Sequence, residues 1–294
     1  MQALKNIRSP GPMFVFPAIL IIALIMIFPL LYTIVLSFNK SDIYSDSWKF
    51  VGIAQYVELF KNPEFLLSLY VTFLWTIGSV VFQFLIGFAA AVVINQDFIR
   101  WKTLIRIVLM VPWVIPSIIS VNVWKWLYHA DFGIINYILK SLGILSTSIN
   151  WVSDEHTALF SAILVNVWKM YPLVMIMVEA ALQSVPKELK DAARVDGATG
   201  WREFTTVTIP HISSTCMSVI LLLTIWTMNA FTFVYVLTEG GPAHQTEILS
   251  LFIYKAGFQN YNFGVAAAAS TILFIITAVL SFVYMRLFMK GEDG

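Results

Sequence analysis

The chain has 294 residues, of which 59% are hydrophobic and 12% charged, with a formal net charge of +1 and a mean hydropathy of +0.80. A soluble domain carries about 25% charged residues, so this chain has too few to cover its surface in water, and a bilayer is its natural solvent. The near-neutral charge gives no basic field for nucleic acid, and the single cysteine, Cys216, leaves no intramolecular disulfide to form.

Six segments are long and apolar enough to cross a bilayer, which takes about 20 residues of helix. They lie near 13–38, 66–95, 105–128, 157–179, 212–237 and 261–286. The first runs uncharged from Ser9 to Asn39, which is longer than the apolar core of a signal peptide, so we expect it to be retained. The sequence therefore predicts an all-α, polytopic membrane protein with one transmembrane domain over residues 1–294.

The distribution of Lys and Arg between the segments outside the spans predicts the orientation. Eleven of the 18 basic residues fall on one face: Lys5, Arg8, Arg100, Lys102, Arg106, Lys187, Lys190, Arg194, Arg202, Arg286 and Lys290. Six others are spread over the longer loops of the opposite face. The positive-inside rule makes the first face cytoplasmic and places both termini inside.

Reactive groups are scarce inside the predicted spans. We expect Arg106, Lys169 and few other ionisable residues there, with essentially no carboxylate. The four histidines are scattered, no H-E-x-x-H motif is present, and no Gly-Lys dipeptide allows a phosphate loop of the G-x-x-x-x-G-K-[ST] type. These features argue against an intramembrane protease or metal enzyme. If ATP drives this protein, another subunit hydrolyses it.

A polar loop over residues 186–210, PKELKDAARVDGATGWREFTTVTIP, separates the fourth and fifth spans. Lys187 to Asp196 has one apolar face and predicts a short helix, which Gly197 ends in a left-handed conformation. We expect a second short helix over Gly200 to Val207, stopped by Pro210 before the fifth span. The pattern alone fits either a solvated amphipathic connector on the membrane surface or a docking element for a cytoplasmic partner.

The loop resembles the E-A-A-x3-G-x9-I-x-L-P signature of bacterial ABC-importer permeases. Asp191-Ala192-Ala193, Gly197 and Val207-Thr208-Ile209-Pro210 keep its spacing, with Asp for Glu, Val for Ile and Ile for Leu. In that family this segment forms the coupling helices that sit in a cleft of the ATPase subunit. The resemblance therefore assigns ATPase coupling to Asp191, Ala192, Ala193, Asp196, Gly197, Val207, Ile209 and Pro210.

Further segments look like the carbohydrate importers: PWVIPS at 112–117, NVWKMYP at 166–172, LQSVP at 182–186 and TEGGP at 238–242. They are similar to the maltose-permease-like family, with its multiple-sugar and glycerol-phosphate permeases, in its compact six-span type. This resemblance implies a type I permease fold in a bacterial inner membrane, a second homologous permease, two copies of an ABC ATPase and an extracytoplasmic solute-binding protein. It also implies a carbohydrate substrate, with ATP and Mg used by the ATPase and no cofactor on this chain.

In that family the solute lies near mid-membrane. The matching positions here are Trp113, Ser117, Asn166, Lys169, Met170, Leu173, Leu223, Thr227 and Ala230. Asn166 and Lys169 are three residues apart and share a helix face, and so would Thr227 and Ala230. Trp113 either stacks on a sugar or packs at the interface, and Asn166 either meets solute or bridges helices. Lys169 snorkels, pairs with a partner carboxylate or meets an anionic solute.

We therefore expect half of the translocation pathway of an ATP-driven, binding-protein-dependent sugar importer that works by alternating access and has no catalytic residues of its own. One alternative is an ion-coupled secondary transporter of small solutes, which would show intramembrane carboxylates. Another is a membrane enzyme or assembly scaffold with a docking loop. The residues do not identify the sugar.

Overall fold

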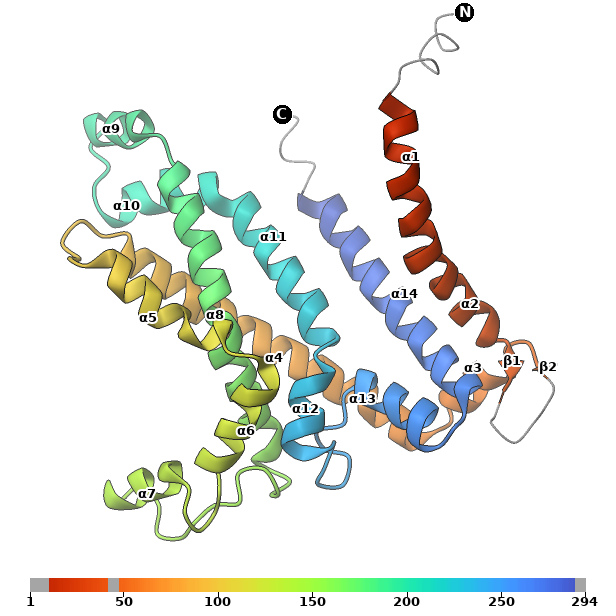
Figure 1. The fold of residues 1–294 in the computed structure, drawn as a ribbon. Helices are drawn as coiled ribbons and strands as arrows, with labels where there is room; N and C mark the ends of the chain where they lie inside the picture. The colour runs from red at the N-terminus through yellow and green to blue at the C-terminus, as the bar shows by residue number, and fades with distance from the viewer. Residues whose placement is uncertain (1–10, 42–47, 289–294) are drawn as a thin grey trace, which may run out of the picture. The chain divides into compact units, whose positions relative to one another are not determined.

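The computed structural model describes residues 11–41 and 48–288. Lys5, Arg8 and Lys290, which contribute to the predicted orientation, lie outside the described residues, as do both ends of the chain. The regular structure is almost entirely helical (Figure 1). The chain divides into two compact units, one formed by 1–62 with 253–275 and the other by 63–252 with 276–294.

The first unit begins with one apolar helix and continues through a short hairpin. Its elements are α1 (Gly11–Ile22), η2 (Ala23–Ile27), α2 (Phe28–Leu36), β1 (Asn39–Lys40), β2 (Lys49–Phe50), α3 (Ala54–Leu59), η4 (Lys255–Gln259) and the first half of α14 (Phe263–Phe288). β1 and β2 are antiparallel, with Asn39 opposite Phe50. The buried Gln55 amide donates to the carbonyls of Ser37 at 3.2 Å and Asn39 at 2.5 Å, which ties α3 to the hairpin.

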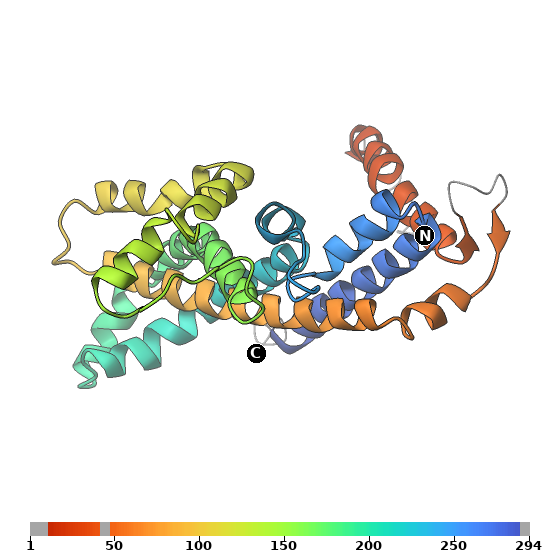
Figure 2. The same ribbon diagram turned by 90° about the horizontal axis from the view of Figure 1, so that it is seen from below.

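The second unit holds the remaining helices. They are α4 (Pro63–Ile94), α5 (Lys102–Val114), α6 (Ser117–Leu127), α7 (Ile134–Ser141), α8 (Ala158–Ser184), α9 (Lys187–Val195), α10 (Trp201–Glu203), η3 (Phe204–Thr208), α11 (Ile209–Met228), α12 (Phe231–Thr238), most of α13 (Leu249–Tyr254) and the end of α14. α4 packs along α8 (Figures 1 and 2). α9 and α10 lie at one end of α8, and α7 lies at the other (Figure 1).

The core of this unit forms where α4, α8 and α11 meet. Ala91, Val174, Val178 and Val219 are buried there and join one apolar cluster. Gly87 allows the close approach of α4 to α8, because a Cβ at this position would lie 2.5 Å from the Cβ of Val174 and 2.6 Å from the carbonyl oxygen of Tyr171. The contact between these two helices is the frame on which the site is built.

Among the described residues, five helices are long and apolar enough to cross a membrane, and the number rises to six if the bent pair α5 and α6 is one span. Two of the six predicted spans differ in their bounds from these helices. The third, expected as one helix over 105–128, is broken between Val114 and Ser117 by a bend of 92°. The fifth, expected over 212–237, runs from Trp201 to Met228, and α12 follows as a separate helix.

The prediction that Pro210 stops a short helix before the fifth span is wrong. α10, η3 and α11 form one continuous helix that passes through Pro210, and its first turn starts at Trp201 rather than at Gly200. The π-helical turn η3 lies just before the proline, and the N–H of Ile209 bonds five residues back to Phe204. The wider turn accommodates a residue that has no N–H and whose ring clashes with the carbonyl four residues earlier.

Candidate functional site

The break between α5 and α6 is created by two prolines four residues apart. Ile115 and Pro116 adopt extended backbone conformations between the two helices. Pro116 has no N–H to give to the carbonyl of Pro112, which would be its partner in a continuous helix. Irregular backbone at membrane depth is tolerated where protein covers it or where it lines a water-filled cavity. The break is thus the place in this span where backbone polar groups need partners from elsewhere.

Lys169 of α8 supplies those partners. Its side chain is buried, with the residue 5% exposed. The ammonium donates to the carbonyls of Pro112 at 2.9 Å and Trp113 at 2.8 Å, and also to the carbonyl of Ile115. The sequence alone allows snorkelling, a partner carboxylate or an anionic solute for this lysine. The structure shows it bonded to backbone oxygens of its own chain.

The other residues predicted to contact solute occupy three different environments. Trp113 and Ser117 flank the break, and Trp113 is 38% exposed. Met170, Leu173 and Leu223 pack in or against the α4–α8–α11 cluster. Thr227 is buried, and its carbonyl accepts the indole N–H of Trp75 at 2.9 Å. The expectation that Ala230 shares a helix face with Thr227 is wrong, because α11 ends at Met228 and Ala230 precedes α12.

Asn166 lies inside the contact between α4 and α8, beside a glutamine that the sequence analysis missed. The Gln83 amide donates to the carbonyl of Asn166 at 3.4 Å, and both side chains are buried. Thr76, Ser79 and Gln83 recur every three or four residues and form a polar stripe on α4. That spacing is the signal by which Gln83 was predictable. Asn166 therefore belongs to a polar seam between two helices.

An ion pair between a partly exposed arginine and a buried glutamate joins α5 to α8. Arg106 donates to both carboxylate oxygens of Glu179, at 2.5 and 2.9 Å, and Gln183 donates to the same carboxylate at 3.2 Å. The expectation of essentially no carboxylate within the spans needs correction, because α8 continues to Ser184 and encloses Glu179. The ion-coupled alternative requires intramembrane carboxylates for the coupling ion. Glu179 does not favour that alternative, since its charge is already balanced by Arg106.

The loop over residues 186–210 is held in a defined shape by its own backbone. α9 ends as predicted at a glycine in the left-handed region, with Gly197 at φ +81°. The N–H of Gly197 bonds the carbonyl of Arg194 at 3.0 Å, and the N–H of Ala198 bonds that of Ala193 at 2.9 Å. These two bonds are the Schellman pattern that ends many helices. The direction in which the chain leaves α9 is therefore fixed.

Arg194 then bridges the two short helices. Its Nε donates to the Glu203 carboxylate at 2.8 Å, and its Nη1 lies 3.6 Å from Asp191. Hydrogen bonding to Glu203 raises the pKa of the Arg194 guanidinium above its ordinary value. Asp191, one of the three residues that depart from the family signature, thus takes part in a small charge cluster on the loop surface.

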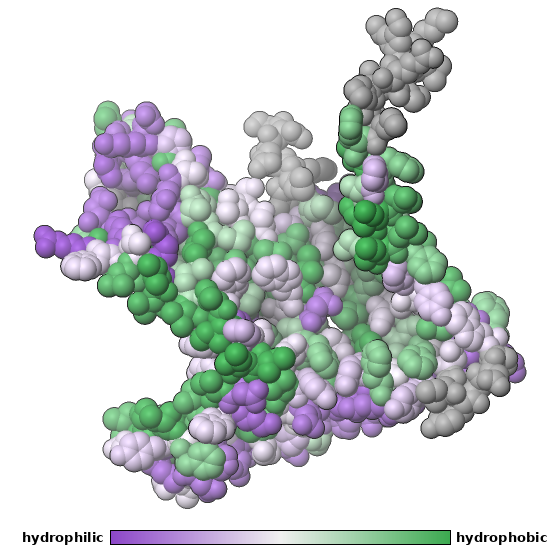
Figure 3. Space-filling model, in the orientation of Figure 1, coloured by the Kyte–Doolittle hydropathy of each residue, from purple (hydrophilic) through white to green (hydrophobic). Residues whose placement is uncertain are grey.

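The loop exposes apolar side chains among its charges. Val195 is 88% exposed and Trp201 77%. Hydrophilic residues gather over α9 and α10 (Figure 3). Of the signature residues, Asp191, Ala192, Asp196, Gly197 and Pro210 are exposed, whereas Val207 and Ile209 pack against the core cluster. The first part of the signature therefore faces outward, and the last part anchors the loop to the membrane helices.

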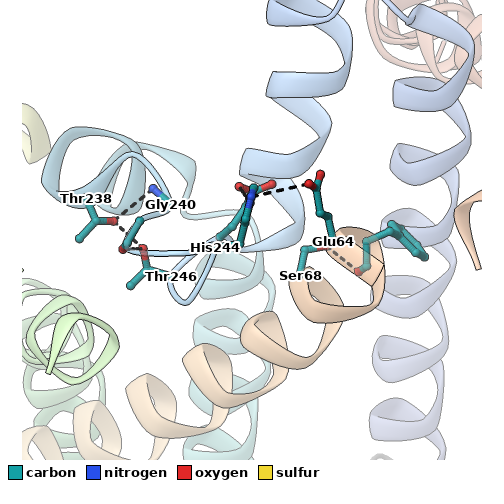
Figure 4. Close-up of polar contacts among 9 residues, drawn as sticks. Glu64, Ser68, Thr238, Gly240, His244 and Thr246 are labelled. Atoms are coloured by element: carbon teal, nitrogen blue, oxygen red, sulfur yellow. Dashed lines mark hydrogen bonds and ion pairs between the residues drawn. The ribbon is translucent and has the colours of Figure 1, made fainter. Parts of the chain in front are cut away.

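On the opposite end of this unit, the loop after α12 is tied by polar contacts (Figure 4). The hydroxyl groups of Thr238 and Thr246 lie 2.7 Å apart, and Thr246 donates to the carbonyl of Gly241 at 2.7 Å. His244 lies between two carboxylates, at 2.7 Å from Glu247 and 3.7 Å from Glu64. The loop carries the TEGGP segment and is held to the first turn of α4.

Five helices long and apolar enough to cross a membrane, with the bent pair α5 and α6, define a multi-pass membrane protein. Residues 83–290 match the family described as binding-protein-dependent transport system inner membrane component. That match covers more than half of the chain, so the chain belongs to this family. It is a transport protein rather than a catalytic subunit. The predicted resemblance to ABC-importer permeases is confirmed.

Relatives cover almost the whole chain. It is 30% identical over 298 residues to the inner membrane ABC transporter permease protein YcjO of Escherichia coli, covering 99% of this chain and 100% of that protein. It is 28% identical over 279 residues to the trehalose/maltose transport system permease protein MalF of Thermococcus litoralis, covering 94% and 92%.

A solved structure shares the fold. A chain in the crystal structure of a bacterial alginate ABC transporter in complex with an alginate pentasaccharide-bound periplasmic protein has a TM-score of 0.84 and 20% identity. The alignment covers 100% of this chain and 99% of that chain. The predicted type I importer permease fold is therefore confirmed.

Proposed function

We propose that this chain is one of two permease subunits of an ATP-driven sugar importer. Membership of the binding-protein-dependent family supports the transport role, and a relative named for trehalose and maltose supports a carbohydrate solute. The observation that carries the proposal is the loop over residues 186–210. Its helix pair is fixed by the turn at Gly197 and the Arg194–Glu203 bridge, and it presents exposed apolar and charged side chains at intact signature spacing.

The partners follow from this role. A second homologous permease completes the pathway, two copies of an ABC ATPase bind ATP and Mg, and an extracytoplasmic protein delivers the solute. Both termini and the loop face the cytoplasm. ATP binding brings the ATPases together and moves the loops docked on them, which opens the spans outward. Hydrolysis of ATP then resets the inward-facing state.

We place solute contact first at Trp113 and Ser117, because they flank the break and Trp113 remains exposed. Met170, Leu173, Thr227 and Ala230 are partly or fully covered neighbours along the same pathway. Asn166 and Leu223 are buried between helices, so their part in solute binding requires the helices to move. Lys169 donates to backbone carbonyls of its own chain, so we do not place it among the solute contacts.

The test is reconstitution of the chain with its partner subunits and binding protein in proteoliposomes, followed by uptake of a panel of mono- and oligosaccharides. Uptake is expected only with ATP inside and ATPase present. Gly197→Pro should leave membrane insertion intact but abolish ATPase retention or uncouple hydrolysis, because proline cannot adopt φ +81°. Uptake that persists without the ATPase contradicts the proposal.

Gly143→Pro is the matched control for this substitution. Gly143 also follows a short helix and has φ +72°, and a Cβ would meet nothing within 4 Å at either glycine. It lies after α7, on the face opposite the loop. ATPase retention and hydrolysis should stay normal in Gly143→Pro. If the two variants lose ATPase equally, or neither loses it, the docking role of the loop fails.

A further inference from the structure

The break between α5 and α6 frees a defined set of backbone carbonyls. In a continuous helix the carbonyls of residues 112 to 115 accept from the N–H groups of residues 116 to 119. Residue 116 is a proline, and the extended conformation of Ile115 and Pro116 turns the following N–H groups away. Inside a bilayer no water is present to bond carbonyls left in this state, so they need partners from the protein.

The Lys169 ammonium takes three of these four carbonyls. It carries three N–H donors, and it donates to the carbonyls of Pro112, Trp113 and Ile115. Its positive charge also lies at the C-terminal end of α5, where the helix dipole is negative. Because the lysine is buried and its three donors are used, no donor is left for a solute.

We propose that Lys169 is a positioning residue, which locks the α5–α6 break by satisfying its carbonyls and thereby fixes Trp113 and Ser117 in the pathway. Trp113 is held directly through its own carbonyl, and Ser117 is the first residue of the helix that follows the break. The solute role of these two residues rests on the proposed function, whereas the lock does not. It follows that Lys169 does not select for an anionic solute.

The test measures the geometry of the break in the transporter assembled with its partner subunits in lipid nanodiscs. Cys216→Ala removes the one cysteine of this chain, and any cysteine of the partner subunits is replaced as well. Spin labels are attached at Leu104→Cys on α5 and Trp126→Cys on α6, both exposed within the chain, and their separation is measured by pulsed electron paramagnetic resonance. The labelled protein with Lys169 intact should give one narrow distance distribution. Lys169→Met should give a broad distribution. Lys140 is an exposed lysine of α7, and Lys140→Met should keep the narrow distribution.

An unchanged distribution in Lys169→Met overturns the lock. If Lys169→Met does not accumulate in the membrane, the added substitution Pro116→Ala decides the matter. Alanine supplies an N–H for the carbonyl of Pro112 and lets the helix continue, so the double variant should regain accumulation. Failure to regain it also overturns the lock. Neither readout depends on uptake, so a failure of sugar transport would reject the proposed function and leave this result standing.

Discussion

Single residues of α8 set the charge balance of the membrane interior. The Glu179 side chain is 4% exposed, and its carboxylate is paired in a bidentate manner with Arg106, whose side chain is 35% exposed. Removing Arg106 and removing Glu179 therefore have different consequences for the residue that is left. Arg106 is partly exposed at the surface of the chain, whereas Glu179 is covered. A buried charge left without its partner is strongly destabilising, but replacing both partners by apolar residues is often neutral.

We expect Arg106→Met to lower the free energy of unfolding by about 3–5 kcal/mol, because it leaves Glu179 buried and uncompensated. Glu179→Met should cost clearly less, and the double variant should lie close to the starting protein. Chemical denaturation of the detergent-solubilised protein, followed by tryptophan fluorescence, measures all three. Equal costs for the two single variants, or a double variant as unstable as Arg106→Met, would contradict this asymmetry.

The sequence predicts the polarity of these residues but not their partners. Lys169 is recognisable as a polar residue inside an apolar span, but its partners are backbone carbonyls 54 to 57 residues away, and a carbonyl has no identity in the sequence. Glu179 lay at the last position of the predicted span because hydropathy falls there, although the helix continues for another turn. Intrinsic polarity is thus visible in the sequence, whereas pairing depends on which helices meet.

At the scale of helices, the contact of α4 with α8 tests whether close packing sets the frame of the site. Gly87→Ala places a Cβ 2.5 Å from Val174, so it should cost about 1–3 kcal/mol of stability through overpacking. Gly78→Ala is the matched control on the same helix. Its Cβ would lie 2.9 Å from the Cδ1 atom of Ile163, a flexible side-chain end that can move away. A thermal shift as large for Gly78→Ala as for Gly87→Ala would contradict this packing.

The Arg194–Glu203 bridge gives a second prediction at this scale, for the helix pair of the loop. Arg194 stays charged throughout the accessible pH range, and the bridge holds α9 against α10. Glu203→Arg should reduce ATPase retention and ATP-driven uptake several-fold with normal membrane abundance, since it sets two cations against each other. The exchange Arg194→Glu with Glu203→Arg should recover most of the loss. Recovery would be absent if each side chain contacts the ATPase independently.

Elements were predicted best where local signals decide them. The end of α9 at Gly197 needed only a residue that tolerates positive φ. The local sequence does not predict which prolines end a helix. α8 continues through Pro172 and α11 continues through Pro210, whereas α5 ends shortly after Pro112. What distinguishes the break is the second proline, Pro116, together with a lysine on another helix that takes the freed carbonyls.

For the whole molecule, orientation in the membrane is a prediction from charge. In the Cys216→Ala background, Val195→Cys on the loop should react with a membrane-impermeant maleimide only after the cytoplasmic side is opened. Tyr137→Cys on α7 should react from outside in intact cells, and both positions are exposed in the chain. Labelling in the opposite sense would reverse the assignment of the loop to the cytoplasm.

One unbroken helix runs from Trp201 in the loop to Met228 in the membrane interior, so a movement of one end is transmitted to the other. Its 28 residues span about 42 Å, so a tilt of one degree about the Trp201 end displaces the other end by about 0.7 Å. Near that far end, the carbonyl of Thr227 holds the indole of Trp75 on α4. A partner that tilts the loop by a few degrees therefore displaces the Thr227 carbonyl by more than this hydrogen bond can stretch. The displacement of the Met228 end per degree of tilt is proportional to the length of the helix.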